Sequence, residues 1–538
     1  MHMRDDDHTT VSPARTDWFV RGLSQVIGGP RGGHATARPG RFWTPVRVVL
    51  ALACLVIALN WLQKSPCMDG AWADNVQYKK GCYTDVLALY YAEHLSDGMI
   101  PYVDFPVEYP VLTGAFMGVL GLPVHALGVK NPALNQAMLF YNVNAVVLGI
   151  LGVATVGILL ALRRRRPWDA ALLACAPAML VTATVNWDLL VLCLAAASML
   201  FWARRKPVWA GVFLGLAVAA KFYPLLMVGP LLLLVLRTLR TPPKADSDGP
   251  GGGSRLAAFW AHNPPLRHAL TTISVALLTW AAINGPVWLF WRESWNRFWD
   301  LNSTRGVDWG TLWYIGAHFP LGGDRYGIPF FQNIAGNVDT LNTAYLLLFV
   351  ICCGGVAVLT FMAPRRPRLA ALAFLVLAAF LLTGKVWSQQ YVLWLIPLAV
   401  LARPRWGAFL AWQAAEIGYF IAFYGELLGA SGGKQAFPEW VFVTASGLRL
   451  GTLAVLCGFV VRDILKPRED IVRDTYADDP DGGVLDGAED ATWVTRLAGP
   501  GGLQREDDRV AVFAPVDPEL VARSAGGALP GGAGNPVA

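Results

Sequence analysis

Charged side chains are scarce in this sequence. Only 15% of its 538 residues are Asp, Glu, Lys or Arg, whereas 55% are hydrophobic and the mean hydropathy is +0.42. A soluble chain of this length would carry about a quarter charged residues. Apolar stretches of bilayer-spanning length recur along most of the chain, so the composition predicts an all-α polytopic membrane protein.

Other signals are also missing. The cysteines show no zinc-type spacing, which argues against a zinc centre. There is no convincing internal repeat of the kind on which many transporters are built. No small-residue cleavage motif follows the first apolar stretch, 46–62, so we expect a retained helix rather than a signal peptide. The net charge of +6 is explained by basic cytoplasmic loops and requires no nucleic-acid partner.

Two of the eight cysteines, Cys67 and Cys82, fall in the first predicted outer loop. An oxidising compartment favours a disulfide there, and closing such a short loop contributes about 3 kcal/mol. Two unpaired thiols are the alternative, and the sequence leaves both open. The other six cysteines lie in apolar stretches or at their edges, where we expect small core residues.

Clusters of Arg and Lys predict the topology. They lie at 163–167, 203–207, 237–244, 364–368, 403–405 and 462–468. If every cluster faces the cytoplasm, an even number of crossings must separate each cluster from the next. Each interval after the first cluster holds two apolar stretches, which satisfies this rule.

The interval before the first cluster is different, because it holds three apolar stretches: 46–62, 111–129 and 138–162. One of them must not cross. Glycines, Pro123 and His125 interrupt 111–129, so we expect that segment to lie at or dip into the outer interface. The prediction is then about twelve spans with both termini cytoplasmic. Residues 63–137 become one large extracytoplasmic loop carrying membrane-parallel helices.

Composition predicts three regions along the chain. Residues 1–43 and 466–538 are polar or rich in Gly, Pro and Asp, and we expect disordered cytoplasmic segments. Residues 44–465 form the transmembrane domain. Within it, 242–265 is expected to be a flexible cytoplasmic loop and 291–340 a second large outer loop.

Acidic side chains collect in the first outer loop, within residues 81–110. Helical spacing begins at Asp85, which is therefore either the N-cap of that helix or a functional acid. We expect Glu93 to be a solvated surface charge. Asp104 and Glu108 are expected outside the lipid, just before the membrane-lying segment.

Cationic and polar side chains stand at span ends and in the second outer loop. Positive charge beside carboxylates at a lipid interface suits an anionic lipid head group together with a second substrate. For any single basic residue, interfacial snorkelling near Trp anchors is the alternative. The candidates are Asn186, Asp188, Lys221, Tyr223, Arg292, Arg297, Arg305, Asp308, His318, Arg325, Lys385, Gln389, Gln390 and Tyr391.

Four segments in a fixed order resemble a known family. They are "YTDVLALYY", "EYPVLTG", "NWD" followed by "RRKPVWAGVFLGLAVAAKFYP", and "GKVWSQQYVLWLIPL". The set is similar to integral-membrane glycosyltransferases of the GT-C class. It is most similar to family 87, the actinobacterial polyprenyl-phosphate-mannose-dependent mannosyltransferases, and covers roughly residues 45–460. Val111 departs from the family's Tyr-Pro-Pro-like motif, which would fit a subgroup with a different acceptor.

The resemblance implies a GT-C-like fold and catalysis on the outer face of a bacterial plasma membrane. It implies inverting transfer of a hexose from a polyprenyl-phosphate sugar to a glycolipid or glycan acceptor. Mannose is the default sugar, with arabinose or another pentose left open. The family's first-loop Asp maps onto Asp85, which we expect to be the catalytic base. We expect no cofactor and no divalent metal, and the oligomeric state is left open.

The expected substrate-binding residues orient the sugar or hold the leaving phosphate, which needs fixed positive charge. Lys221, Lys385 and one arginine are expected at the phosphate, and His318 at the phosphate or the acceptor. The full set is Asp104, Glu108, Tyr109, Lys221, Tyr223, Arg292, Arg297, Arg305, His318, Lys385, Gln389 and Gln390.

A lipid-linked sugar flippase or other transporter is the main alternative function, and a scaffold in envelope assembly is a third. Transporters place polar residues at broken helices near the bilayer midplane. Here the ionisable residues gather in loops and at span ends, which favours chemistry at the interface.

Overall fold

The structure is a computed structural model that describes residues 10–28, 42–240, 255–322, 325–434 and 436–497. Helices make up nearly all of its regular elements. In the first half of the chain they are α1 (Pro13–Thr16), α2 (Trp18–Gly28), α3 (Pro45–Lys64), α4 (Val76–Lys79), α5 (Asp85–Ala92), α6 (Val111–Lys130), α7 (Gln136–Leu162), α8 (Ala171–Ala174), α9 (Pro177–Thr182), α10 (Asp188–Ala203), α11 (Pro207–Ala220), α12 (Val228–Arg237) and α13 (Arg255–His262).

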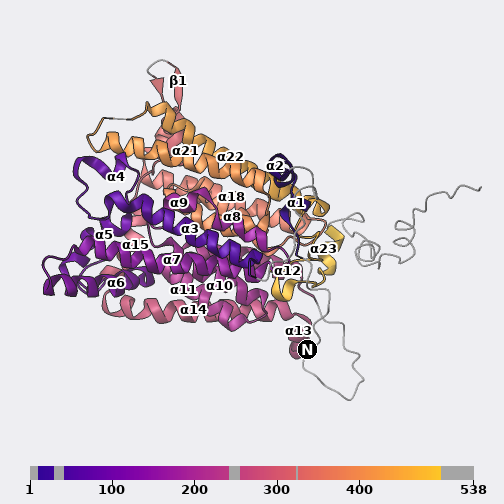
Figure 1. The fold of residues 1–538 in the computed structure, drawn as a ribbon. Helices are drawn as coiled ribbons and strands as arrows, with labels where there is room; N and C mark the ends of the chain where they lie inside the picture. The colour runs from indigo at the N-terminus through magenta and orange to yellow at the C-terminus, as the bar shows by residue number, and fades with distance from the viewer. Residues whose placement is uncertain (1–9, 29–41, 241–254, 323–324, 435, 498–538) are drawn as a thin grey trace, which may run out of the picture.

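The second half continues with longer helices and one small hairpin. The helices are α14 (Pro264–Phe290), α15 (Arg292–Thr304), α16 (Leu312–Ala317), α17 (Pro329–Ala335), α18 (Val338–Met362), α19 (Leu369–Thr383), α20 (Val392–Ala402), α21 (Trp406–Ala430), α22 (Glu439–Leu465) and α23 (Thr492–Leu497). The hairpin pairs β1 (Pro320–Gly322) with β2 (Arg325–Tyr326) in antiparallel register, with Pro320 opposite Tyr326. The long helices run side by side in one bundle (Figure 1).

Within the residues that the structure describes, five helical segments are long and apolar enough to cross a membrane. They are Pro45–Cys67, Val111–Lys130, Gln136–Leu162, Pro264–Phe290 and Val338–Met362. Five shorter apolar segments accompany them: Asp188–Ala203, Pro207–Ala220, Tyr223–Arg237, Leu369–Thr383 and Gln389–Ala402. The chain is therefore a mostly helical membrane protein, and the count of twelve spans stays a prediction.

One end of the bundle gathers the arginine clusters, and we call it the basic end. Arg163 after α7, Arg237 at the end of α12 and Arg368 before α19 all pair with aspartates between residues 470 and 490. The crossing rule used on the sequence requires these clusters to share one end, as they do here. Which membrane face this end occupies stays a prediction.

The tail differs from the predicted disorder over residues 466–497, which we call the strap. The strap packs across the basic end, with α23 in yellow at the right of Figure 1. Asp470 pairs with Arg368 at 2.7 Å, and Asp481 pairs with Arg163 at 2.6 Å. Without the strap these buried arginines would lack their counter-charges. The rest of the tail lies outside the described residues.

The N-terminal segment also differs from the predicted disorder, within residues 10–28. Asp17 caps α2, because its Oδ1 accepts from the Phe19 N–H at 2.9 Å. Its Oδ2 accepts from the Trp406 N–H at 2.8 Å, which ties α2 to the start of α21. The predicted flexible loop 242–265 contains α13, and its first part lies outside the described residues.

Helix α6 meets the length and hydropathy of a span, yet both of its ends lie at one end of the bundle. Near its start, Thr113 Oγ1 donates to the carbonyl of Ala220, the last residue of α11, at 2.7 Å. Near its end, a Cβ at Gly128 would meet Gln136, the first residue of α7. Both neighbours lie opposite the arginines, at what we call the loop end. These contacts agree with the interpretation that this segment does not cross.

A disulfide joins Cys67 to Cys82 in the first loop, which decides between the two alternatives left by the sequence. In the second predicted loop, 291–340, the described residues form α15, α16, the hairpin and α17. Helices α4, α5, α6 and α15 gather at the loop end, at the left of Figure 1.

Candidate active site

Asp85 occupies the first position of α5 at the loop end, but Thr84 caps the helix. The Thr84 hydroxyl oxygen accepts from the Val86 N–H at 3.2 Å. The same hydroxyl donates to the carbonyl of Thr184 at 2.7 Å. The backbone N–H of Asp85 donates to the carbonyl of Val185, also at 2.7 Å. The start of α5 is therefore fixed against the segment before α10, and helix capping does not account for the Asp85 carboxylate.

Three polar side chains surround that carboxylate. Asp85 Oδ2 accepts from Asn186 Nδ2 at 2.7 Å and from Gln390 Nε2 at 3.3 Å. Tyr83 hydrogen-bonds to the carboxylate as well. Burial raises the pKa of Asp85 above its ordinary range, and the hydrogen bonds from Asn186 and Tyr83 oppose this rise. A carboxylate with a raised pKa is better suited to accept a proton near neutral pH.

Asn186 links the Asp85 carboxylate to Tyr109. Its Nδ2 donates to the Tyr109 hydroxyl at 2.5 Å as well as to Asp85. Its Oδ1 accepts from the backbone N–H of Trp187 at 2.7 Å, which fixes the orientation of the amide. The amide therefore holds the Asp85 carboxylate and the phenol of Tyr109, which lies just before α6, in one arrangement.

Lys221 lies beside Tyr109 but is paired with Asp188. Its Nζ is 2.6 Å from Asp188 Oδ1, which also accepts from Trp394 Nε1 at 2.6 Å. The ammonium lies 5.8 Å from the ring centroid of Tyr109. It lies 5.3 Å from the ring centroids of both Tyr391 and Trp394. The charge of Lys221 is therefore balanced by Asp188 in this structure, and its role at the donor phosphate stays a prediction.

Glu108 supplies a second carboxylate near Asp85. Burial raises the pKa of Glu108 and the charge of Asp85 raises it further, while Arg305 and Arg297 oppose the rise. The Glu108 backbone N–H donates to Glu93 Oε1 at 3.3 Å.

Glu93 is only 4% exposed, so the expectation that it is a solvated surface charge is wrong. Burial raises the pKa of Glu93 to about 7.

Lys385 and Arg305 bring positive charge to the same region. Lys385 Nζ donates to the carbonyl of Arg305 at 2.6 Å, and the Lys385 carbonyl accepts from the Asp308 N–H at 2.8 Å. Burial lowers the pKa of Lys385, and the charge of Arg305 lowers it further. The Arg305 side chain is 43% exposed and lies 3.5 Å from Asp308, so it is the more accessible of the two cations.

Three predicted site residues lie away from this cluster. Asp104 is exposed and its carboxylate bonds to the backbone of its own turn at 2.9 Å. Arg292 is exposed, with its guanidinium 5.3 Å from the ring centroid of Trp288. His318, the C-cap residue of α16, stacks on Tyr314 of the same helix. The structure does not bring these three to Asp85.

Two further predicted residues pack behind the cluster. Gln389 Nε2 donates to the Tyr424 hydroxyl at 2.9 Å. The ring of Tyr223 stacks on Trp394 with centroids 4.5 Å apart. Gln389 and Tyr223 are both buried, and their contacts are with Tyr424 and Trp394.

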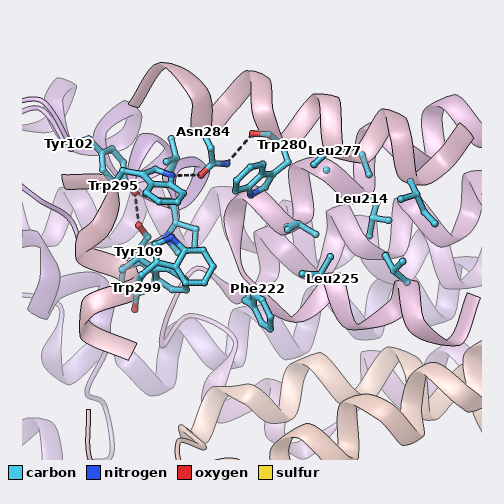
Figure 2. A pocket seen from close by; sticks show the side chains of 18 residues that line it. Tyr102, Tyr109, Leu214, Phe222, Leu225, Leu277, Trp280, Asn284, Trp295 and Trp299 are labelled. Atoms are coloured by element: carbon cyan, nitrogen blue, oxygen red, sulfur yellow. Dashed lines mark hydrogen bonds between the residues drawn. The ribbon is translucent and has the colours of Figure 1, made fainter. Parts of the chain in front are cut away.

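An apolar groove adjoins the cluster at Tyr109, and Figure 2 shows the side chains that line it. It has a volume of about 330 Å³ and lies between α11, α14 and α15. Its walls include Leu214, Val218, Phe222, Leu277, Trp280 and Trp299. Tyr109 lines one end of this groove, and its hydroxyl accepts from the same Asn186 amide that holds Asp85.

Asn284 fixes one wall of the groove. Its Oδ1 accepts from Trp295 Nε1 at 3.1 Å, and its Nδ2 donates to the carbonyl of Trp280 at 3.1 Å (Figure 2). These bonds pin α15 onto α14. Close to Trp295, the Tyr102 hydroxyl donates to the carbonyl of Tyr109 at 2.9 Å (Figure 2). The groove is therefore built on a fixed polar frame with apolar walls.

The sequence named Asn186 and Asp188 as polar residues at a span end but gave them no role in the site. Their position in "NWD", at the start of an apolar stretch, was the available signal. Tyr83 and Trp394 lie inside the quoted motifs "YTDVLALYY" and "GKVWSQQYVLWLIPL", but neither was named as a site residue. The structure places each of them in a hydrogen bond to a carboxylate.

The family model of glycosyltransferase family 87 matches residues 109–386, just over half of the chain. The matched range includes Tyr109, Asn186 and Lys385, and it begins after Asp85. A comparison with curated proteins gives no match.

Proposed function

Because the chain belongs to glycosyltransferase family 87, we propose that it transfers a hexose, with mannose as the first candidate, from a polyprenyl-phosphate sugar to a cell-envelope glycolipid or glycan. One observation supports a lipid-linked donor. The apolar groove ends at Tyr109, whose hydroxyl accepts a hydrogen bond from the same Asn186 amide that bonds to Asp85. Burying a polyprenyl chain on apolar walls gains roughly 25 cal/mol per Å². The phosphate and sugar would then stand beside Asp85.

The proposed reaction is a displacement at the anomeric carbon of the donor sugar. An acceptor hydroxyl oxygen forms the new bond to this carbon while the bond from carbon to phosphate oxygen breaks. The electron pair of the broken bond leaves with the lipid phosphate, and Asp85 takes the hydroxyl proton. A single displacement inverts the configuration of the sugar.

Neighbouring residues take supporting roles in this scheme. Asn186 and Gln390 hold Asp85 Oδ2 in place. Glu108 stands near enough to Asp85 for the charge of Asp85 to raise the pKa of Glu108, and Glu108 is proposed to orient sugar hydroxyls. Arg305 and Lys385 are proposed to hold the leaving phosphate, because fixed positive charge stabilises the developing negative charge.

We further propose that the loop end faces outward from a bacterial plasma membrane and that both termini are cytoplasmic. The arginine-rich basic end supports this orientation, since Lys and Arg are enriched in cytoplasmic loops. The scheme uses no cofactor and no divalent metal.

Replacing Lys385 with alanine is expected to weaken donor binding by about tenfold, since a charge-assisted hydrogen bond contributes roughly 1.5–3 kcal/mol. The substitution removes one cation and also the bond that fixes the carbonyl of Arg305. Equilibrium binding of polyprenyl phosphate to the purified protein measures the effect. Lys130→Ala, an exposed lysine at the end of α6, is the matched control. Unchanged donor affinity in Lys385→Ala would remove this lysine from the phosphate site.

Replacing Val218 with tryptophan is expected to fill the groove and raise the KM for a long-chain donor by about tenfold. A donor with a short lipid chain should be affected much less, because it occupies less of the groove. Initial rates with donors of several chain lengths measure this. Val350→Trp, on the exposed face of α18, is the control. An equal effect on all chain lengths would show that the groove does not hold the lipid.

Product formation tests the proposed function as a whole. The purified protein is incubated with polyprenyl-phosphate mannose and a panel of envelope glycolipids, and new glycolipid is separated by chromatography. A mannosylated product supports the proposal. Sugar transport across vesicles without any product would support the flippase instead.

A further inference from the structure

The segment that carries Lys385, Gln389 and Gln390 has no helical structure between the end of α19 and the 3₁₀ turn Gln389–Tyr391. A segment of this kind needs contacts from elsewhere to hold its side chains in place. On one side, the Asp308 N–H donates to the carbonyl of Lys385 at 2.8 Å. On the other side lies Arg449 from α22, a helix beyond the residues matched by the family model.

The side chain of Arg449 binds backbone carbonyls in the middle of the segment. Its Nη1 donates to the carbonyl of Trp387 at 3.2 Å, and its Nη2 donates to the carbonyl of Ser388 at 3.4 Å. Its guanidinium also lies between two rings, 4.0 Å from the centroid of Trp387 and 4.1 Å from that of Tyr419. The planar fork of an arginine allows these contacts together, which a lysine could not reproduce.

Glu416 on α21 fixes the guanidinium. Its Oε2 accepts from Arg449 Nε at 2.9 Å, and its Oε1 accepts from Trp412 Nε1 at 3.0 Å. Glu416 and Arg449 are both buried. A buried ion pair adds little net stability compared with an apolar pair of the same size, so stability alone does not explain its presence.

We propose that Arg449 and Glu416 form a positioning pair that sets the 385–390 segment, and through it the contact of Gln390 with Asp85. The inference rests on the proposed function, because it assigns the pair a purpose in sugar transfer. The path is short: Ser388, whose carbonyl Arg449 holds, directly precedes the turn that carries Gln390 to Asp85. Neither Arg449 nor Glu416 contacts Asp85 itself.

Hydrogen–deuterium exchange on the full-length protein tests the positioning without any substrate. In Arg449→Lys and in Glu416→Gln, amides of residues 385–391 should exchange about tenfold faster, while those of α7 stay unchanged. Arg462→Lys is the matched control, since Arg462 lies on the same helix but pairs with Glu469 at the basic end. Unchanged exchange at 385–391 in both variants would overturn the proposal, whether or not the protein transfers sugar.

Turnover supplies the second test. Arg449→Lys should lower kcat by at least about tenfold, and the KM for the donor should change little. Combining it with Gln390→Ala should lower kcat no further than the worse single variant, because both act through one contact. Full additivity of the two effects would contradict action through Gln390. Absence of turnover in the wild-type protein would count against the proposed function and leave the exchange result to decide the inference.

Discussion

Replacing Asp85 with asparagine is expected to lower sugar transfer by about 10²–10⁴-fold, the range typical of a lost general base. Asparagine has nearly the same shape, but its amide cannot take the proton of the acceptor hydroxyl. The contacts that place α5 come from the backbone of Asp85 and from Thr84, so the helix should stay where it is. Initial rates of the purified variant, normalised to folded protein, measure the loss.

The control for this prediction is Asp97→Asn in the same loop. Asp97 is exposed and pairs with His94, so its loss should leave turnover unchanged. Size-exclusion profiles and melting temperatures of both variants should match those of the wild-type protein. Retained turnover in Asp85→Asn would rule out Asp85 as the base, and Glu108 would then become the next candidate.

Deleting residues 467–538 is expected to prevent recovery of folded protein. The deletion removes the carboxylate partners of Arg163, Arg237 and Arg368, which are all buried. Leaving a buried charge without its partner costs about 3–5 kcal/mol. Several such losses together approach the roughly 5–15 kcal/mol by which a domain is stable.

Deleting only residues 498–538 is the matched control, because it keeps the strap. Detergent-solubilised yield, size-exclusion profile and melting temperature are the measurements. The single substitution Asp481→Asn leaves Arg163 without its carboxylate partner and should lower the melting temperature by several degrees. Because it removes no residue, this variant distinguishes the effect of the lost ion pair from the effect of the lost packing. A normal melting temperature in the longer deletion would show that the strap does not stabilise the basic end.

The sequence predicts the helical membrane fold well because its signals are local. Apolar length identifies the spans, and arginine clusters indicate which helix ends lie together. The same count predicts that α6 does not cross, since three apolar stretches before Arg163 break the even number, and this stays a prediction. Its contacts with Ala220 and Gln136 then place both ends of α6 at the loop end.

The strap was beyond such reasoning. Its Gly, Pro and Asp content is typical of a disordered tail, yet its aspartates meet arginines more than 100 residues away in sequence, as Asp470 meets Arg368 and Asp481 meets Arg163. Composition records that a segment is polar but not which partners it has. Glu93 is a similar case, because its burial depends on how the first loop folds back on itself.

The candidate site was only partly predictable for the same reason. Gln390 bonds to Asp85 and Glu108 lies near it, although these residues come from three separate motifs, and their roles stay predictions. The pairing of Lys221 with Asp188 could not be read from either motif, since it depends on how α10 and α11 meet.

The stoichiometry of the reaction tests the central claim most directly. The purified protein is given polyprenyl-phosphate mannose and an accepted glycolipid, and both released polyprenyl phosphate and mannosylated product are quantified. The account predicts one polyprenyl phosphate released for each sugar transferred, with inverted anomeric configuration, and almost none of either product from Asp85→Asn. Sugar movement across vesicles without release of polyprenyl phosphate, or equal release by Asp85→Asn, would contradict it.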